Sequence, residues 1–298
     1  MQESLPPTSS HRSSLVRRAW GVLVVAVVST AVGCKDSAKI SAAQAVEHVR
    51  FLSETVVKDV GEVRSGLPDG AKEFSRLLAA DPTVKTDPKN TADALAIARR
   101  KVQDLRISKG TFFAFADDSF VVVRNDQEQD RMAGKSLLAS FPGLAAAKAK
   151  YTETMGSMPE AAGVRAPRAD GQWIAGAPVV VAGELAGVYV TGWSWSSYAY
   201  RLEFALRGKI RSELSARREE NEPLVYVFVV VGDSVYGAPV SPDVTRSTLS
   251  ALHPLTRATG DAIASDKVEI TGRQYGYAVQ RTPMLGENVG ILVLRSET

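Results

Sequence analysis

Apolar residues between positions 40 and 63 recur every three or four residues, the spacing that lines one face of an amphipathic helix. The residues that share this face are Val46, Val49, Leu52, Val56, Val60 and Val63. The run Gly66-Leu67-Pro68-Asp69-Gly70 has the composition of a turn, so we expect the helix to end there. A short helix over 72–79 is predicted next, and then a longer one that is capped by Thr91 and ended by Gly110.

The period of the apolar positions changes to two after Gly110, which indicates β-strands. Residues 111–116 and 120–124 are predicted to form a hairpin around an Asp-rich turn. A broken helix over 135–150 and a strand over 151–155 follow, before a loop rich in Gly, Pro and Ala.

Two octets of similar sequence lie 103 positions apart. Gly183–Val190 reads Gly-Glu-Leu-Ala-Gly-Val-Tyr-Val, and Gly286–Val293 reads Gly-Glu-Asn-Val-Gly-Ile-Leu-Val. Each begins with a glycine-containing turn and continues into β-branched residues typical of a central strand. Each also follows a strand that ends in proline, 173–178 in the first half and 275–283 in the second. The octets therefore predict two closing hairpins of the same kind.

The elements upstream of the second octet repeat those upstream of the first. A long helix is predicted over 196–220, hairpin strands over 224–231 and 234–236, a helix over 241–252 and a strand over 267–270. Each half runs helix, hairpin, helix, strand, hairpin, so we interpret the chain as a duplication of one unit.

Composition places this chain of 298 residues among globular proteins, since 45% of it is hydrophobic and 23% is charged. That length is enough for two domains of ordinary size. The formal net charge is +3, of which residues 1–33 contribute two, because Arg12, Arg17 and Arg18 outnumber Glu3. The nearly neutral remainder has no basic cluster and therefore no electrostatic footprint for nucleic acid, so we exclude nucleic-acid partners.

The N-terminus has the organisation of an export signal. A basic region ends at Arg18, and the apolar stretch 19–33 is 15 residues long. That is short for a membrane span of roughly 20 residues but typical of a signal peptide. The stretch ends in Ala31-Val32-Gly33-Cys34, and Cys34 is the only cysteine in the sequence, so an internal disulfide is excluded.

This ending resembles the lipobox of bacterial lipoproteins, with Ala31 where Leu is usual. The resemblance implies that residues 1–33 are a lipoprotein signal peptide that is removed. It also implies that Cys34 is acylated, for example with palmitate, and anchors the protein on the extracytoplasmic side of the inner or outer membrane. The alternative is a buried or stray thiol beside an uncleaved anchor.

The first half resembles the extracytoplasmic PAS-like domains called Cache domains. The resemblance rests on Phe115–Arg124, which reads Phe-Ala-Asp-Asp-Ser-Phe-Val-Val-Val-Arg, on Gly134-Lys135-Ser136-Leu137 and on Phe141-Pro142. These segments are similar to the family's strand, Asp-rich turn, strand ending in arginine, then Gly-x-x-Leu and a proline. Gln172–Trp193 is similar to the family's closing hairpin. The second half lacks the Asp-rich turn and the arginine, so pattern alone carries the resemblance there.

The resemblance spans about residues 40–298 and implies an α+β fold with a long N-terminal helix and two Cache-like domains, the double Cache arrangement. Each domain would be a roughly five-stranded antiparallel sheet flanked by helices. The expected division gives 34–195 to the N-terminal helices and first domain, and 196–298 to the linker helix and second domain.

Membership of this family would imply a sensor of small molecules, usually amino acids, amines or carboxylates. The aromatic and Asp pattern that marks the family's amino-acid receptors is not evident in this sequence. Family receptors continue into a membrane helix and a signalling module, whereas this sequence stops at Thr298. We therefore expect a separate partner protein to carry out signal transduction.

No catalytic or metal-binding motif is recognisable. His48 and His253 are the only histidines after the signal segment, and no G-x-S-x-G, H-E-x-x-H or S-x-x-K motif is present. Two isolated histidines without a carboxylate or thiolate cluster make a poor metal site. We therefore predict a protein that is not an enzyme and has neither cofactor nor metal.

A ligand of the first domain would need polar and aromatic side chains on the sheet. Our hypothesis is that an arginine receives a ligand carboxylate, bidentate if geometry allows, while aromatic rings enclose its apolar part. The alternative is that the aromatic side chains pack beneath the helices and the arginines are solvated. The candidate ligand-binding residues are Arg124, Arg131, Tyr151, Trp173, Tyr189 and Trp193.

Two functions follow from these observations. The first is a membrane-anchored, extracytoplasmic lipoprotein that senses a small molecule and acts through a separate partner. The second is a non-enzymatic scaffold of the cell envelope, in which the same fold has a filled, non-binding pocket. A sheet centre occupied by large side chains would favour the scaffold.

Overall fold

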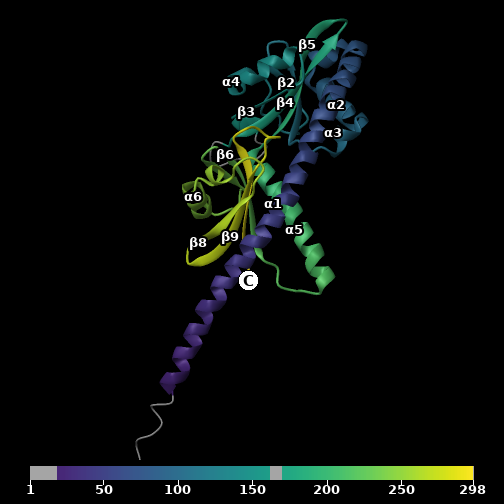
Figure 1. Ribbon diagram of the computed structural model, residues 1–298. Helices are drawn as coiled ribbons and strands as arrows, with labels where there is room; N and C mark the ends of the chain where they lie inside the picture. The colour runs from purple at the N-terminus through teal and green to yellow at the C-terminus, as the bar shows by residue number, and fades with distance from the viewer. Residues whose placement is uncertain (1–18, 162–169, 298) are drawn as a thin grey trace, which may run out of the picture.

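The computed structural model describes the backbone of residues 19–161 and 170–297, and side chains from Ser37 onward. Its dominant element is α1 (Ala19–Ala80), a helix of 62 residues that runs along both halves of the molecule (Figure 1). At 1.5 Å per residue it is about 90 Å long. Residues 1–18 and the side chain of Cys34 lie outside the described part, so removal of the signal segment and acylation stay predictions.

Short helices follow α1 and pack beside it. They are η1 (Pro82–Lys85), α2 (Pro88–Lys101) and α3 (Gln103–Ile107). Asp87 caps α2, since its side chain accepts the N–H groups of Lys89 and Asn90 at 2.8 and 2.9 Å. The predicted cap Thr91 is wrong: Thr91 lies inside the helix and donates its hydroxyl to the Val84 carbonyl at 2.6 Å. The Asp-Pro pair supplies both the cap and the first helical position.

The first sheet is antiparallel, with the strands in the order β2-β1-β5-β4-β3. Its strands are β1 (Phe112–Asp117), β2 (Val122–Asn125), β3 (Thr152–Gly156), β4 (Gln172–Val181) and β5 (Glu184–Ser194). One face packs on α1. The other face is covered by α4 (Leu137–Ser140), η2 (Pro142–Lys148) and η3 (Pro159–Ala161).

The second sheet repeats this topology in the order β7-β6-β10-β9-β8. Its elements are β6 (Leu224–Val231), β7 (Ser234–Gly237), α6 (Asp243–Ala251), α7 (Pro254–Arg257), β8 (Ala264–Ile270), β9 (Arg273–Arg281) and β10 (Val289–Ser296). The helix α5 (Trp195–Arg217) connects the two sheets. The two octets fall on β5 and β10 with the turns before them, and each of these strands is central in its sheet. The predicted α+β class and the repeated order of elements are confirmed.

The amphipathic stripe of α1 is confirmed, since Val49, Leu52, Val56, Val60 and Val63 are fully buried. The middle of α1 packs on the second sheet, where Ser53 donates a hydrogen bond to Gln280 at 2.7 Å. The C-terminal part of α1 packs on the first sheet, where the Phe74 ring lies 4.8 Å from that of Phe115.

The predicted helix break at Gly66–Gly70 is wrong, because α1 continues through Pro68 to Ala80. A β-carbon at Gly70 would lie 2.4 Å from the Leu105 side chain and 2.8 Å from the Tyr189 ring. The glycines therefore let α1 approach α3 and the first sheet closely. Burial of the adjoining Leu67 and Ala71 offsets the cost of a proline inside the helix.

One apolar core joins the two halves of the molecule. It includes Trp195 and Tyr198 of α5, Trp193 of the first sheet, and Val227 and Val293 of the second. Tyr198 stacks on Trp193 with ring centroids 4.6 Å apart. The division into 34–195 and 196–298 stays a prediction, because this core continues across position 195.

Candidate functional site

The aromatic candidates lie on the face of the first sheet that α1 covers. Trp173, Trp193 and Tyr189 are each at most 1% exposed. Trp173 stacks on Trp193 at 4.4 Å, and Tyr189 packs between Phe74 and Phe113 at 5.9 Å from each ring. Burial raises the pKa of the Tyr189 hydroxyl. These rings form the core beneath α1, as the alternative interpretation of the sequence proposed for them.

Tyr151 belongs to a joint between the two halves. Its hydroxyl donates to Glu153 at 2.9 Å, and Arg64 of α1 donates to the same carboxylate at 2.5 and 3.0 Å. Arg64 also donates to the carbonyl of Met284, which lies between β9 and β10. Tyr151 therefore supports an ion pair that joins α1, the first sheet and the second half.

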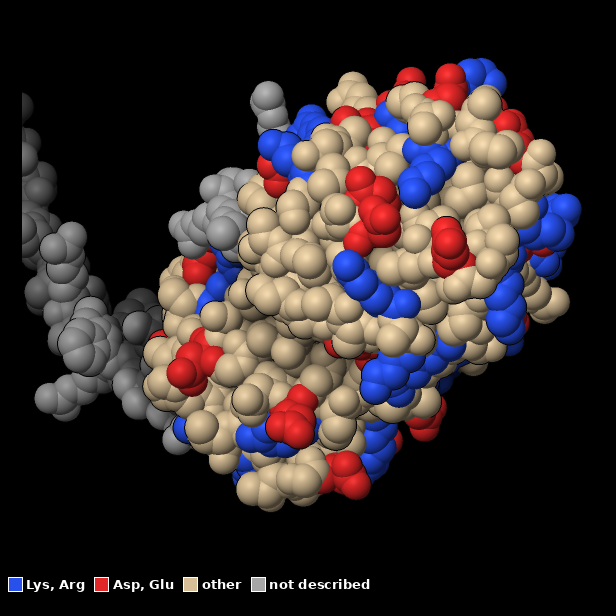
Figure 2. Space-filling model, turned by 90° about the horizontal axis from the view of Figure 1, so that it is seen from above, with Lys and Arg blue, Asp and Glu red and all other residues tan. Residues whose placement is uncertain are grey.

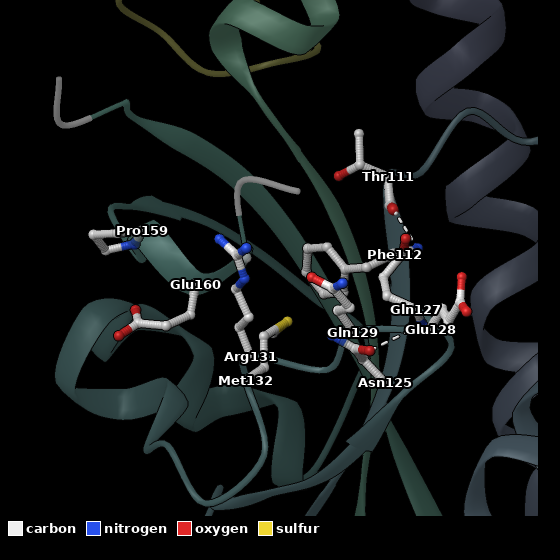
Figure 3. A pocket seen from close by; sticks show the side chains of 11 residues that line it. Thr111, Phe112, Asn125, Gln127, Glu128, Gln129, Arg131, Met132, Pro159 and Glu160 are labelled. Carbon is white, nitrogen blue, oxygen red and sulfur yellow. Dashed lines mark hydrogen bonds between the residues drawn. The ribbon is translucent and has the colours of Figure 1, made fainter. Parts of the chain in front are cut away.

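The face of the first sheet away from α1 is filled by apolar side chains except at one end. The apolar cluster on this face includes Phe112, Ala114, Phe120, Phe141, Leu144, Ile174, Val188 and Val190. A pocket of about 150 Å³ remains beside the adjoining ends of β1 and β2 (Figure 3). Its lining is largely polar: Thr111, Phe112, Asn125, Gln127, Glu128, Gln129, Arg131, Met132, Pro159, Glu160 and Ala161.

Arg131 is the candidate that faces this pocket, and in Figure 3 its guanidinium extends between Glu160 and Gln129. No hydrogen-bond or ion-pair partner of Arg131 exists among the residues that the structure describes. The loop that carries it is fixed by Asp130, whose side chain accepts the N–H groups of Asn125 and Met132 at 2.9 and 2.8 Å. A fixed loop that presents a free guanidinium suits recognition of a carboxylate.

Arg124 has a different position. In the register it is opposite Phe115, whose side chain lies on the α1 face, so Arg124 is directed away from the pocket. Its guanidinium lies 3.7 Å from the Asp130 carboxylate and donates to the Gln127 carbonyl at 3.1 Å. Arg124 therefore supports the loop that presents Arg131.

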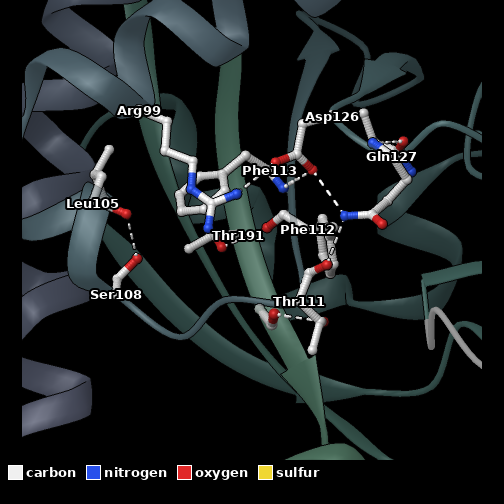
Figure 4. A network of polar contacts seen from close by, with 11 residues as sticks. Arg99, Leu105, Ser108, Thr111, Phe112, Phe113, Asp126, Gln127 and Thr191 are labelled. Atoms are coloured by element: carbon white, nitrogen blue, oxygen red, sulfur yellow. Dashed lines mark hydrogen bonds and ion pairs between the residues drawn. The ribbon is translucent and has the colours of Figure 1, made fainter.

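A polar network connects the pocket wall to α2 (Figure 4). Asp126 accepts the Phe113 N–H at 2.8 Å and pairs with Arg99 of α2 at 3.1 Å. The Gln127 side-chain amide donates to Asp126 at 3.2 Å and to the Thr111 carbonyl at 2.8 Å. This network fixes the position of Gln127, which lines the pocket, relative to β1 and α2.

Sequence reasoning missed Asp126, Gln127 and Arg99. The polar run 125–131 was a visible signal for the first two, whereas nothing local distinguishes Arg99 from a solvated helix residue.

Among residues 37–161 and 170–297, no group of three or more His, Cys, Asp or Glu side chains is placed to hold a metal ion. The same described part has no helix both long and apolar enough to cross a membrane. Figure 2 shows acidic and basic side chains interspersed on the face it presents.

No known family's sequence profile matches the chain, and no curated protein sequence matches it. Several solved structures are similar. A domain of a sensory box/GGDEF family protein from Vibrio parahaemolyticus covers 88% of this chain, with 98% of its own length, 12% identity and a TM-score of 0.55. The extracellular domain of the histidine kinase vpHK1S-Z8 covers 88% with 93% of its length, at the same identity and TM-score. A structure of methyl-accepting chemotaxis protein X covers 87%, with 98% of its length, 14% identity and a TM-score of 0.52.

These similarities show the fold. The chain has two five-stranded antiparallel sheets with flanking helices and a long N-terminal helix, in a PAS- or Cache-like arrangement. The fold expected from the sequence is therefore confirmed.

Proposed function

We propose that this protein is an extracytoplasmic sensor of a small molecule and that Arg131 binds the carboxylate of its ligand. The observation that carries the proposal is the Arg131 guanidinium, which has no partner among the described residues and lies in a polar pocket on the sheet face away from α1. The fold supports it, since similar structures include the extracellular domain of a histidine kinase and a chemotaxis protein.

The pocket limits the size and charge of such a ligand. Its volume of about 150 Å³ is below the roughly 300–1,000 Å³ of pockets for drug-sized molecules. Glu128 and Glu160 also line it, and they would repel a second carboxylate. The proposed ligand is therefore a small monocarboxylate, with its carboxylate on Arg131 and its polar substituents toward Gln127 and Gln129.

Thermal unfolding of the purified full-length chain tests this function. The screen would contain small monocarboxylates, dicarboxylates, amino acids, amines and nucleosides. A ligand at about a hundred times its dissociation constant adds roughly 2.7 kcal/mol, and each kcal/mol raises the midpoint by about 2–4 °C in a domain of 150–250 residues. We expect a shift from a monocarboxylate in the wild type.

The matched variants are Arg131→Gln and Arg106→Gln, the latter at an exposed arginine of α3. The shift should disappear in Arg131→Gln and persist in Arg106→Gln. An undiminished shift in Arg131→Gln would show that the carboxylate binds elsewhere.

We also propose that Cys34 is the lipid-bearing N-terminal residue of the mature protein and that a membrane-associated partner receives the signal. The sequence around Cys34 supports the anchor. Metabolic labelling with a palmitate analogue in a bacterial host should mark the wild type and not Cys34→Ser. Equal labelling of the two would disprove acylation at this cysteine.

The scaffold function retains specific support, because large side chains fill most of both faces of the first sheet. Phe204 and Tyr200, one turn apart on α5, are also 69% and 53% exposed, as residues at a protein contact would be. A screen without any ligand, together with crosslinking to an envelope protein that Phe204→Ser abolishes, would favour this alternative.

A further inference from the structure

A second hollow, separate from the pocket that Arg131 lines, lies between α1 and α5. Its walls are α1, α5, which runs beside α1 in Figure 1, and the link that follows α3. It has a volume of about 540 Å³ and includes Asp59 and Glu62 of α1, Lys109 of the link and Arg201 of α5. We call it the interhelix groove.

The two carboxylates of the groove differ in whether they have partners. Asp59, which is 2% exposed, accepts the hydroxyl of Tyr198 at 3.2 Å and forms an ion pair with Arg201. Glu62, almost one turn further along α1, is 9% exposed, and its Oε2 atom is buried without a hydrogen-bond partner among the described residues. A buried carboxylate oxygen without a donor is costly, so this position favours a ligand that supplies one.

We propose that the interhelix groove is a second binding site, for a small organic cation whose protonated amino group donates a hydrogen bond to Glu62. The groove also contains Lys58 and Lys109, whose ammonium groups have no ion-pair partner in the described part of the chain. They would repel a second positive charge, so a monoamine fits the groove better than a diamine. The interhelix groove shares no lining residue with the pocket at Arg131, so ligand binding in the groove does not depend on that pocket.

The raised pKa of the Glu62 carboxyl group is consistent with a cationic ligand. Burial raises the pKa of its carboxyl group, and the negative charge of Asp59 raises it further, against the opposing effects of Lys109, Lys58 and Arg201. A bound ammonium group would stabilise the ionised form. Binding should therefore weaken as pH falls through the raised pKa, because the protonated carboxyl group no longer attracts the cation.

An occupant of the groove would connect three segments that belong to different parts of the fold. α1 packs on both sheets, the link leads into β1, and α5 packs on β6 of the second sheet. Such a ligand would therefore hold α5 against α1 at the point where the two halves are connected.

Calorimetric titration of the full-length chain with three four-carbon probes tests this site. The probes are n-butylamine, n-butanol and butyrate, which share a chain length and differ in charge. We expect heat from butylamine with the wild type and none from butanol. Glu62→Gln should weaken butylamine binding at least tenfold, as expected for loss of a charge-assisted hydrogen bond. Glu54→Gln, at an exposed carboxylate of the same groove, should leave it within about twofold.

Two further variants make the result decisive. Ala205→Phe places a large ring on the α5 wall without removing a carboxylate and should also abolish butylamine binding. Arg131→Gln should leave butylamine binding unchanged while it removes any carboxylate response, so the two sites can fail separately. Butylamine binding that survives both Glu62→Gln and Ala205→Phe, or its absence from the wild type, would overturn the proposal.

Discussion

At the scale of single residues, the two arginines first considered as ligand-binding residues differ in whether their guanidinium groups already have partners. Arg124 belongs to β2, and Arg131 lies seven positions later in the loop that follows. Arg124 is held by Asp130 and the Gln127 carbonyl, whereas Arg131 faces a pocket without a partner in the described residues. Only the second is available to a ligand without a loss of existing contacts.

Part of the candidate site could be predicted from the sequence. The polar run that contains Arg131 is a local signal, and strand alternation placed Tyr189 and Trp193 together on one face, as the structure confirms. Alternation does not say which face α1 covers. The aromatic residues were therefore assigned to a pocket, although they form the core beneath the helix.

His48 provides a prediction at this scale. Burial, together with the positive charge of Arg295, lowers the pKa of this α1 histidine to about 4. The unfolded state takes up a proton near pH 6.5 and the folded state does not, so this stabilisation is present above that pH and is lost as pH falls toward 4. The shift corresponds to roughly 2–3 kcal/mol of unfolding free energy over that range.

Urea unfolding of the wild type and His48→Gln at pH 7, 6, 5 and 4 measures this effect. The variant cannot titrate at that position, so its stability should fall less on acidification. Parallel loss of stability in the two proteins would show that His48 is not the responsible group.

At the scale of elements, sequence patterns correctly predicted the features that depend on residues close together in the chain. They failed for the features that depend on contacts between residues far apart in the chain. The apolar stripe of α1 and the strand alternation were correct because each follows from spacing along one segment. The predicted break at Gly66–Gly70 was wrong because these glycines serve contacts with Leu105 and Tyr189, which are remote in sequence. Glycine is common both in turns and where a helix packs closely against its neighbours, so composition alone does not distinguish the two.

Two glycines of α1 test this explanation. Gly70→Ala should destabilise the protein by about 1–3 kcal/mol, since the new methyl group would overlap Leu105 and Tyr189. Gly61→Ala is the matched control, because nothing lies within 4 Å of a β-carbon there. It should stabilise by about 0.5–1 kcal/mol through helix propensity alone. Equal effects of the two changes on unfolding free energy would refute a packing role for Gly70.

At the scale of the whole molecule, one helix and one core make the two halves interdependent. α1 packs on both sheets, and the apolar core beneath it continues from Trp193 through α5 to Val227. The Arg64 ion pair with Glu153 and its hydrogen bond to Met284 add a polar joint at the same junction. A ligand-induced change in the first domain would therefore reach the second through several contacts.

Arg64→Gln tests the polar joint. We expect a loss of only about 0.5–1 kcal/mol, since the arginine side chain is 39% exposed. Amide hydrogen exchange should nevertheless become faster between β9 and β10, where Met284 loses its contact. Arg50→Gln removes an exposed ion pair with Glu47 within α1 and should leave that exchange unchanged. The same exchange rates in both variants would contradict a connecting role for Arg64.

A crystal structure of the protein with the monocarboxylate that gives the largest thermal shift would show directly whether Arg131 binds the ligand. We expect a carboxylate within hydrogen-bond distance of Arg131, on the sheet face away from α1, with Gln127 or Gln129 in contact with the rest of the ligand. A carboxylate bound at any other place, with the Arg131 pocket empty, would contradict it.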